Sequence, residues 1–295
     1  MKLNIVKHRK IWYAFSTVLV LASLFALVGF GLKPGIDFTG GTLLEVSIES
    51  KPVHAKIQEV LVASGHDEAV VQVSNESVLV RTEPITEEQH QKLLASFESA
   101  FGKTTELRFD SIGPVIGNEL RRNALIGVAV SLLLIGAYIS WAFRGAGDFI
   151  SSKKIALLTV IKTAHDVFIS IGAYAILGYF FGYEMDTAFV AASLTILGYS
   201  INDGVVVLDR TRENLKNRIS PHLTEVVDKA IEQTLARSIN TSVTVFLALL
   251  AVYLFGGVTT RPFALLLLIG VAVGTYSSVF IASPALVTLE KWGKK

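Results

Sequence analysis

Ionisable side chains interrupt two long apolar stretches of this 295-residue chain. One stretch contains His165 and Asp166 within the run KTAHDVF, and a later one contains Asn202 and Asp203 within GYSINDGVVVLDR. A carboxylate in the middle of a membrane costs on the order of 2.5 to 3.5 kcal/mol, so such groups should face a protein interior or a wet cavity. Burial also makes a carboxyl group hold its proton closer to neutral pH, as a reversible proton carrier requires. The pattern therefore indicates an ion pathway or a structural pair.

Both interpretations of these polar residues stay open from the sequence. A cation or backbone donors could hold Asp203 permanently charged for helix packing alone, and His165 could simply bond to a neighbour. Arg237 opens another apolar stretch in ARSINTS and would meet Asp203 if their helices pack side by side. We interpret Asp209 and Arg210 as a solvated helix end. The candidate proton-pathway residues are Asp203, Arg237, Asn202, His165 and Asp166.

The chain offers no pattern of a known catalytic or metal site. It has no HExxH and no GxSxG motif, and it has no cysteine. In PGIDFTGGTLL, at 34–44, a strand-like run follows the glycines, whereas a phosphate loop needs Lys-Ser or Lys-Thr and then a helix. Asp37 is not followed by the regular oxygen ligands of a calcium loop. We therefore expect no enzyme activity, no cofactor and no bound metal.

The glycine pair in this same stretch is better explained by backbone geometry. It stands where the chain turns from an apolar helix into a strand, and a sharp turn there needs φ > 0. A Gly-Pro step stands before the next apolar block. The hinge or structural candidates are Gly40, Gly41, Gly113 and Pro114.

The elements that must position these residues are long apolar blocks, and 51% of the chain is hydrophobic. The first block, 11–32, has no charge and would form a helix roughly 33 Å long, enough to cross a bilayer core. It is longer than the apolar core of a signal peptide, so we interpret it as a retained anchor. Five more blocks predict helices at about 124–143, 157–181, 187–208, 239–257 and 263–287. The expected fold class is a multi-pass α-helical membrane protein with six spans, of which spans 2 to 6 occupy 121–287.

A hydrophilic interval at 33–120 separates the first span from the second. Its charges and backbone groups need water or each other, so it must be a soluble domain. Its patterns predict, in order, a strand at 42–49, a helix at 53–64, two hairpin strands around Asn75 and Glu76, a helix at 87–101 and a strand at 105–112. Thr86 and Gln89 form a capping box before the second helix. This βαββαβ order predicts a ferredoxin-like α+β domain, a fold that assigns no function by itself.

Lys and Arg in short flanks indicate which helix ends face the cytoplasm. Such cations gather before span 1, between spans 2 and 3, between spans 4 and 5, and at the end of the chain: Lys2, Lys7, Arg9, Lys10, Arg144, Lys153, Lys154, Arg210, Arg212, Lys216, Arg218, Lys229, Arg237, Lys291, Lys294 and Lys295. The short opposite loops carry only Arg261, although Arg121 and Arg122 disagree with the majority. We therefore expect 1–10 and 288–295 in the cytoplasm and the soluble domain on the extracytoplasmic side.

Two further patterns concern helix packing. The cytoplasmic loop 210–238 contains a helix start at Ser220-Pro221 and then an apolar stripe, which predicts an amphipathic helix along the membrane surface or against a partner. Two pairs of glycines four residues apart, Gly178 with Gly182 and Gly270 with Gly274, predict helix faces that pack closely against a neighbouring helix.

Several motifs together resemble the SecF family of the bacterial Sec protein-export machinery, over nearly the whole chain. They are GIDFTGGTLLEV at 35–46, GPVIGNEL at 113–120, HDV at 165–167, LTILGYSINDGVVVLDRTREN at 194–214 and RSINTS at 237–242. The chain departs from the family pattern at Gly204, where Thr is usual, and at Leu208 and Thr211, where Phe and Ile are common.

The resemblance implies half of a transporter of the resistance-nodulation-division superfamily, placed in the bacterial cytoplasmic (inner) membrane. The implied partners are SecD, the SecYEG channel, YajC, unfolded preprotein and membrane lipids, with no nucleic acid. Carried over, Asp203 and Arg237 match the family's proton-pathway residues. A partner is also suggested independently, because transporters of this architecture place their coupling site between two repeats and this chain supplies one.

Three functional hypotheses result. The first is an accessory export subunit that, with SecD, uses proton-motive force to assist late preprotein translocation on the outer side of the membrane. The second is a membrane scaffold or extracytoplasmic chaperone that conducts no protons. The third is half of a small-molecule exporter.

Overall fold

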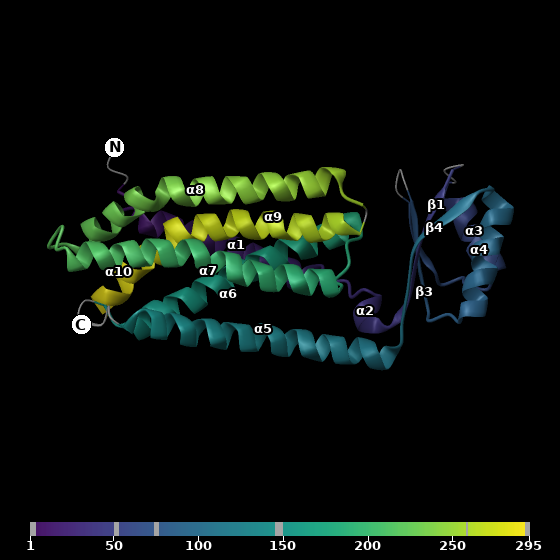
Figure 1. Cartoon of the computed structure of the whole chain (residues 1–295), viewed down its shortest axis with the longest axis horizontal. Helices are drawn as coiled ribbons and strands as arrows, with labels where there is room; N and C mark the ends of the chain where they lie inside the picture. The colour runs from purple at the N-terminus through teal and green to yellow at the C-terminus, as the bar shows by residue number, and fades with distance from the viewer. Residues whose placement is uncertain (1–3, 50–52, 74–76, 145–149, 258, 293–295) are drawn as a thin grey trace. The chain divides into compact units, whose positions relative to one another are not determined.

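A computed structural model describes residues 4–49, 53–73, 77–144, 150–257 and 259–292. The chain divides into two compact units. The membrane unit comprises Met1–Lys33, Ile126–Tyr183 and Ala188–Lys295, and the soluble unit comprises Pro34–Leu125 with Glu184–Thr187. Figure 1 shows the long helices of the first unit and the small sheet of the second.

The soluble unit has the predicted ferredoxin-like α+β fold. Its elements are α2 (Ile36–Thr39), β1 (Gly41–Ile48), α3 (His54–Ala63), β2 (Val70–Val73), β3 (Val78–Thr82), α4 (Glu87–Phe101) and β4 (Thr104–Ile112). The sheet order is β2-β3-β1-β4, and each neighbouring pair is antiparallel. This is the split βαβ arrangement, with α3 and α4 on one face of the sheet (Figure 1).

The core of the soluble unit follows from the period of its sequence. Leu44, Val46 and Ile48 alternate along β1 and are buried against Leu61 of α3 and Phe97 of α4. Both helices end where the sequence has glycine, at Gly65 with φ +83° and Gly102 with φ +80°. Thr86 and Gln89 form the predicted capping box. The predicted turn at Asn75-Glu76 lies outside the described residues.

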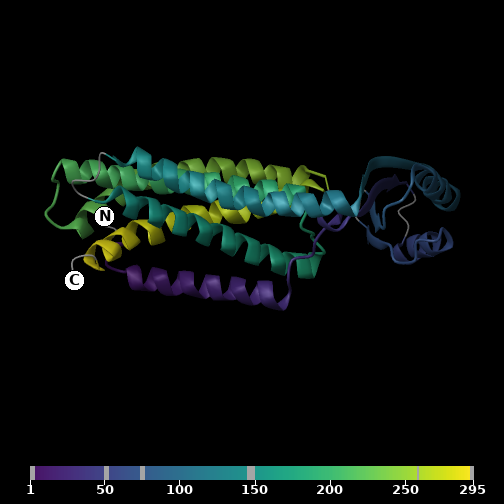
Figure 2. The ribbon, with the colours of Figure 1, turned by 90° about the horizontal axis from the view of Figure 1, so that it is seen from below.

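The chain is a multi-pass membrane protein, with six helical segments long and apolar enough to span a membrane among the described residues. They are α1 (Arg9–Gly29), α5 (Pro114–Ala142), α6 (Ser152–Phe181), α7 (Thr187–Lys216), α8 (Leu223–Phe255) and the combination of α9 (Thr260–Ser277), the π-helical turn η2 (Ser278–Ala282) and α10 (Ser283–Trp292). Within the membrane unit these helices run alongside one another (Figure 2). The six expected spans are all present.

Several of these helices begin earlier than the apolar blocks predict, and α5 is a clear example. The second block starts near residue 124, whereas α5 begins at Pro114 and runs unbroken through Arg121 and Arg122. Proline fits the first turn of a helix, and nothing after it breaks the helix. The apolar block therefore identified only the part of α5 that favours a lipid environment. Hydropathy indicates which residues suit the membrane core, and it does not indicate where the helix begins.

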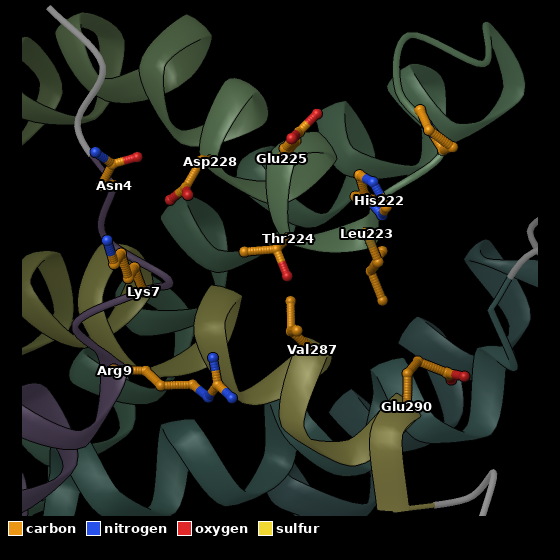
Figure 3. Close-up of a pocket in the computed structure, with 11 residues that line it drawn as sticks. Asn4, Lys7, Arg9, His222, Leu223, Thr224, Glu225, Asp228, Val287 and Glu290 are labelled. Atoms are coloured by element: carbon orange, nitrogen blue, oxygen red, sulfur yellow. The ribbon is translucent and has the colours of Figure 1, made fainter.

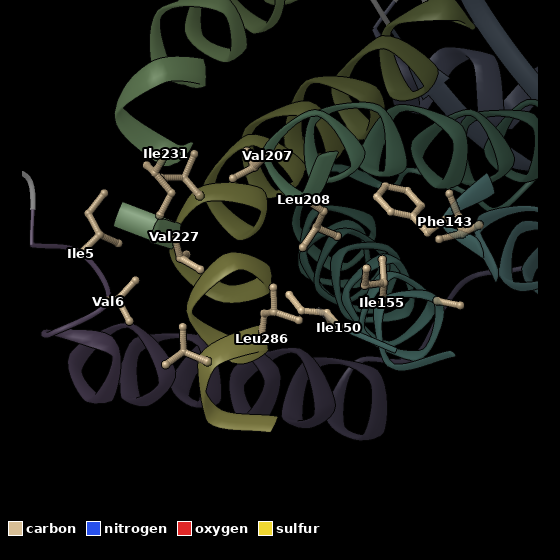
Figure 4. Packing of buried hydrophobic residues seen from close by; sticks show 14 residues of the cluster. Ile5, Val6, Phe143, Ile150, Ile155, Val207, Leu208, Val227, Ile231 and Leu286 are labelled. Carbon is tan, nitrogen blue, oxygen red and sulfur yellow. The ribbon is translucent and has the colours of Figure 1, made fainter. Parts of the chain in front are cut away.

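The helix expected in loop 210–238 also differs from the structure. It is continuous with span 5 as α8, and its apolar stripe is buried inside this chain. Val227 and Ile231 pack in one cluster with Ile5, Val6 and Leu286 (Figure 4). The N–H of Val6 also donates to the Asp228 carboxylate at 2.9 Å. The stripe therefore packs against the N-terminal segment and α10 of this same chain.

Glycine permits close contact between two helix pairs. A Cβ at Gly270 of α9 would lie 2.3 Å from Ile196 of α7. The helix face that carries Gly270 and Gly274 therefore packs closely against another helix, as predicted. The other predicted pair serves a different purpose, since Gly182 adopts φ +72° and ends α6. A contact that the sequence did not indicate joins α6 to α1, where a Cβ at Gly172 would lie 2.3 Å from Ser23.

Candidate functional site

A buried ion pair lies at the centre of the membrane unit. Lys162 and Asp166 stand one turn apart on α6, with Nζ and Oδ2 3.1 Å apart and both side chains almost fully buried. A buried charge pair is tolerated only when its remaining donors and acceptors are satisfied. The surrounding helices must therefore supply those partners.

The ammonium of Lys162 has a full set of acceptors. Besides Asp166, it donates to the backbone oxygen of Ser200 on α7 and to the Ser200 hydroxyl, the latter at 2.9 Å. An ammonium group has three protons and no acceptor. Three acceptors around Nζ therefore match the charged form of this lysine.

The Asp166 carboxylate connects four helices. Its Oδ2 accepts hydrogen bonds from Ser200 on α7 and Ser277 on α9, both at 2.7 Å. Its Oδ1 lies 2.9 Å from Nδ1 of His165, and Nε2 of that imidazole lies 2.5 Å from the Ser16 hydroxyl on α1. Charge-assisted hydrogen bonds of this kind are stronger than neutral ones. The pair is therefore bound on every side by the bundle.

Asp203 is a second buried carboxylate, only 4% exposed, and it follows Ser200 along α7. Its Oδ2 accepts a hydrogen bond of 3.3 Å from Ser242 of α8. Ser242 in turn contacts the hydroxyls of Tyr199 at 2.9 Å and Thr275 at 2.6 Å. The Ser238 hydroxyl is also buried and lies near this carboxylate, but outside hydrogen-bonding geometry. Asp203 therefore has fewer and longer hydrogen bonds than Asp166.

Two cations act on Asp203 through space. Lys162 and Arg237 both attract its carboxylate electrostatically. Arg237 is exposed on α8 and lines a pocket of about 340 Å³ together with Asp209, Arg210 and Thr234. The structure thus brings Arg237 toward Asp203, as an electrostatic partner at the edge of a polar pocket.

The remaining candidates separate into two groups. His165 and Asp166 belong to the buried network, whereas the Asn202 side chain is exposed on the surface of α7. Adjacent positions on a helix point about 100° apart, so Asn202 and Asp203 face different surroundings. The pathway role of Asn202 therefore stays a prediction, and the structure places its side chain away from the buried network.

A second pocket, of about 660 Å³, surrounds the start of α8 (Figure 3). Lys7 and Arg9 line it on one side, and Glu225, Asp228 and Glu290 supply negative charges. Asp228 already accepts a hydrogen bond from the Val6 N–H, and Glu290 pairs with Lys154 at 2.9 Å. Asp228 and Glu290 of this pocket thus make contacts within the chain.

The hinge candidates also divide. Gly40 and Gly41 have φ of +78° and +142°, and a Cβ at either would lie 2.9 Å from backbone atoms of Pro114 or Thr82. Pro114 is the first residue of α5. Around Gly113 no atom lies within 4 Å of an added Cβ, so no contact in the described part of the chain requires glycine there. The nearby Asp37 carboxylate accepts a 2.6 Å hydrogen bond from the first N–H of α7, at Thr187.

The chain matches known export proteins along most of its length. The family described as "Protein export membrane protein SecD/SecF, C-terminal" matches residues 92–292, and the "SecD/SecF GG Motif" matches residues 25–51. The "Protein translocase subunit SecF" of Anaerolinea thermophila is 40% identical over 293 residues, which cover 98% of this chain and 94% of the relative. This chain belongs to the SecF family. That of Thermobaculum terrenum is 39% identical, over 98% of this chain and 94% of its own length.

Relatives of this chain also include longer proteins. The crystal structure of SecDF from Thermus thermophilus, described as a translocon-associated membrane protein, matches with a TM-score of 0.86 at 35% identity. The match covers 100% of this chain and 39% of the SecDF chain. As a SecF-family member, the present chain is a multi-pass membrane protein with an accessory role in Sec protein export.

Sequence reasoning missed the most deeply buried cation of this SecF site. Lys162 is the first letter of the same KTAHDVF run that drew attention to His165 and Asp166. A Lys four residues before an Asp lies on the same helix face, and inside an apolar block this spacing predicts an internal ion pair. That signal was present. No comparable signal identified Ser200 and Ser277, because a serine in the sequence does not show which helices pack together.

Proposed function

We propose that this chain acts with SecD and uses proton-motive force to assist the late stage of preprotein translocation on the outer side of the membrane. Asp203 is the proton carrier, and Arg237 adjusts how readily the carboxyl group releases its proton. The soluble unit lies on the extracytoplasmic side, where it contacts unfolded preprotein as the proton cycle changes the membrane unit.

The single observation that supports this proposal is the contrast between the two buried acids. Asp166 is bound by a cation and by hydroxyl groups, whereas Asp203 has one long hydrogen bond to Ser242 and forms no direct ion pair among the described residues, although Lys162 and Arg237 attract it electrostatically. A carboxylate with few stabilising partners in an apolar surrounding is the one that gains and loses a proton most readily near neutral pH. Arg237 is exposed at the edge of a polar pocket and acts on the Asp203 carboxylate electrostatically from that side.

The partners and the location follow from the same proposal. The chain resides in the bacterial inner membrane with both termini in the cytoplasm, since short cytoplasmic flanks carry most of its Lys and Arg. SecD supplies the second repeat, and the pair works beside the SecYEG channel, with YajC as a further component. The chain performs no enzymatic step and needs no cofactor.

The test replaces Asp203 by Asn in the assembled complex and measures preprotein export in energised inner-membrane vesicles. We expect the export that depends on proton-motive force to be lost, while SecD still co-purifies, because Asn keeps the shape and cannot carry a proton. Asp209→Asn is the matched control, since Asp209 is an exposed acid on the same helix. Normal export with Asp203→Asn would remove the carrier role.

A scaffold without proton conduction is the second candidate. The observation that favours it is the full set of partners around Lys162 and Asp166, because a saturated buried pair can serve helix packing alone. In that case Asp203→Asn lowers the stability of the complex or its binding to SecD, and the unaltered complex carries no proton flux. The two candidates therefore predict opposite results for assembly and for flux.

A further inference from the structure

Among the described residues of the membrane unit, one buried cation, Lys162, accompanies two buried carboxylates, Asp166 and Asp203. Lys162 pairs directly with Asp166 and also attracts Asp203 electrostatically. With Asp203 protonated, the buried group of three has no net charge, and with Asp203 ionised it carries one excess negative charge. Because net charge is costly away from water, the position of this lysine bears directly on whether Asp203 keeps its proton.

The backbone of α7 leaves space for this arrangement. A Cβ at Gly204, the residue after Asp203, would lie 3.9 Å from Nζ of Lys162 and 3.9 Å from the Ser278 hydroxyl. The ammonium therefore lies beside the Asp203-Gly204 step, on the same face of α7 as Ser200. A larger side chain at 204 would compete with Lys162 for this place.

The other charged groups around this lysine come from few elements. His165 stands on α6 itself, Asp203 on α7, and Arg237 on α8 at the edge of a pocket. From α1 and α9 the network receives the hydroxyls of Ser16 and Ser277. Lys162 is therefore the cation that the two carboxylates share inside the bundle, while Arg237 acts from the exposed side.

We propose that Lys162 is a positioning residue for the proton on Asp203: its fixed ammonium, held by Asp166 and Ser200, sets how tightly Asp203 binds hydrogen ions. Lys162 keeps its own three protons and transfers none. Asp166 partly cancels the field of Lys162 at Asp203, so the two residues act in opposite directions. This inference rests on the proposed function, in which Asp203 is the group that exchanges a proton.

The test is a pH titration of the Asp203 carboxyl band by difference infrared spectroscopy, on the complex of this chain with SecD in lipid vesicles. The band is assigned by its loss in Asp203→Asn. In Asp166→Asn the uncancelled ammonium favours the ionised form, and we expect the midpoint to move to lower pH by about one unit. In Lys162→Met/Asp166→Asn the ammonium is gone, and we expect the midpoint to move to higher pH by about one unit.

The double variant removes both charges together, so it leaves no unpaired buried ion and is expected to fold. Thr159→Val is the matched control, because Thr159 is buried on α6 and bonds only to its own helix, at the Ile155 oxygen. Its midpoint should equal that of the unaltered complex. If Asp166→Asn does not fold, the double variant decides alone.

Each outcome separates the two proposals. Midpoints of the Asp203 titration that move in opposite directions in the two variants support the role of Lys162. A move of the midpoint to higher pH in the double variant is enough by itself to support that role. A titrating band that stays in place in the folded double variant overturns that role and leaves Asp203 as a carrier. A complex without any titrating Asp203 band overturns the proposed function, and with it this inference.

Discussion

The interiors of the two units both contain apolar clusters but differ in the polar side chains that they bury. In the soluble unit, Leu61 and Phe97 lie in an apolar cluster beneath the sheet. In the membrane unit, the residues that join α6, α7 and α9 include a lysine, an aspartate and several serines, next to glycines that allow close contact. The soluble core buries only a few polar groups, such as Glu45 and Ser77, whereas the membrane unit buries a lysine-aspartate pair in addition to its own apolar cluster.

The solvent explains this difference. A soluble domain gains stability by removing apolar side chains from water. A membrane helix already has apolar surroundings, so burying more leucine gains little, and helices associate through close packing and hydrogen bonds. Large apolar residues accordingly stay on the outer surface of α5, where Val130, Leu133 and Leu134 are exposed. The buried polar residues therefore hold the helices of the bundle together, and they are also the groups at which proton chemistry is possible.

The largest effect should come from unpairing the buried charges. Lys162→Met leaves Asp166 as an uncompensated buried carboxylate, and we expect a loss of about 3 to 5 kcal/mol in the free energy of unfolding. The measurement is equilibrium unfolding in mixed micelles, compared with Lys162→Met/Asp166→Asn, which should recover most of the loss. A single variant as stable as the unaltered protein would show that the polar network does not hold the bundle together.

The matching change in the soluble unit truncates an apolar side chain. Leu61 is fully buried, and Leu61→Ala should destabilise that unit by about 2 to 5 kcal/mol through lost burial and a new cavity. Val62→Ala on the same helix is the control, because Val62 is 53% exposed. Amide hydrogen exchange of the sheet strands in the full chain reports the change. If both variants exchange alike, the apolar core is not what stabilises this unit.

A smaller effect should come from the glycine before β1. Gly40→Ala places a side chain at φ +78°, where L-residues lose roughly 1 to 2 kcal/mol, and 2.9 Å from the nitrogen of Pro114. Gly113→Ala is the matched control, because an added Cβ there meets no atom within 4 Å. Thermal unfolding of the two variants should differ by a few degrees. Equal melting temperatures would mean that the turn relaxes without strain.

The sequence predicted the soluble unit better than the bundle. Alternating apolar residues such as Leu44 and Val46 identify a strand because water covers one face of the sheet, and glycines such as Gly102 mark helix ends. In the membrane, hydropathy identifies each span but not its true start. Pro114, a hinge or structural candidate from the sequence, is the first residue of a long helix.

The sequence predicted the two acidic residues of the candidate site but not its buried lysine. Asp166 and Asp203 stand out as charges among apolar neighbours, whereas Lys162 was overlooked although it stands four residues before Asp166. That Ser277 joins Asp166 depends on which helices meet, and a single sequence contains no such information. Asn202 was predicted in the pathway beside Asp203, and sequence adjacency does not show that the turn of the helix leaves its side chain exposed.

Proton flux into proteoliposomes is the most direct test of the central claim that Asp203 gains and loses a proton during work. The vesicles would contain this chain with and without SecD, under an imposed proton gradient, with Asp203→Asn and Asp209→Asn compared in the complete complex. We predict flux in the complete complex, unchanged by Asp209→Asn and abolished by Asp203→Asn. Equal flux with and without the Asp203 carboxyl group, or none in the unaltered complex, would contradict the account.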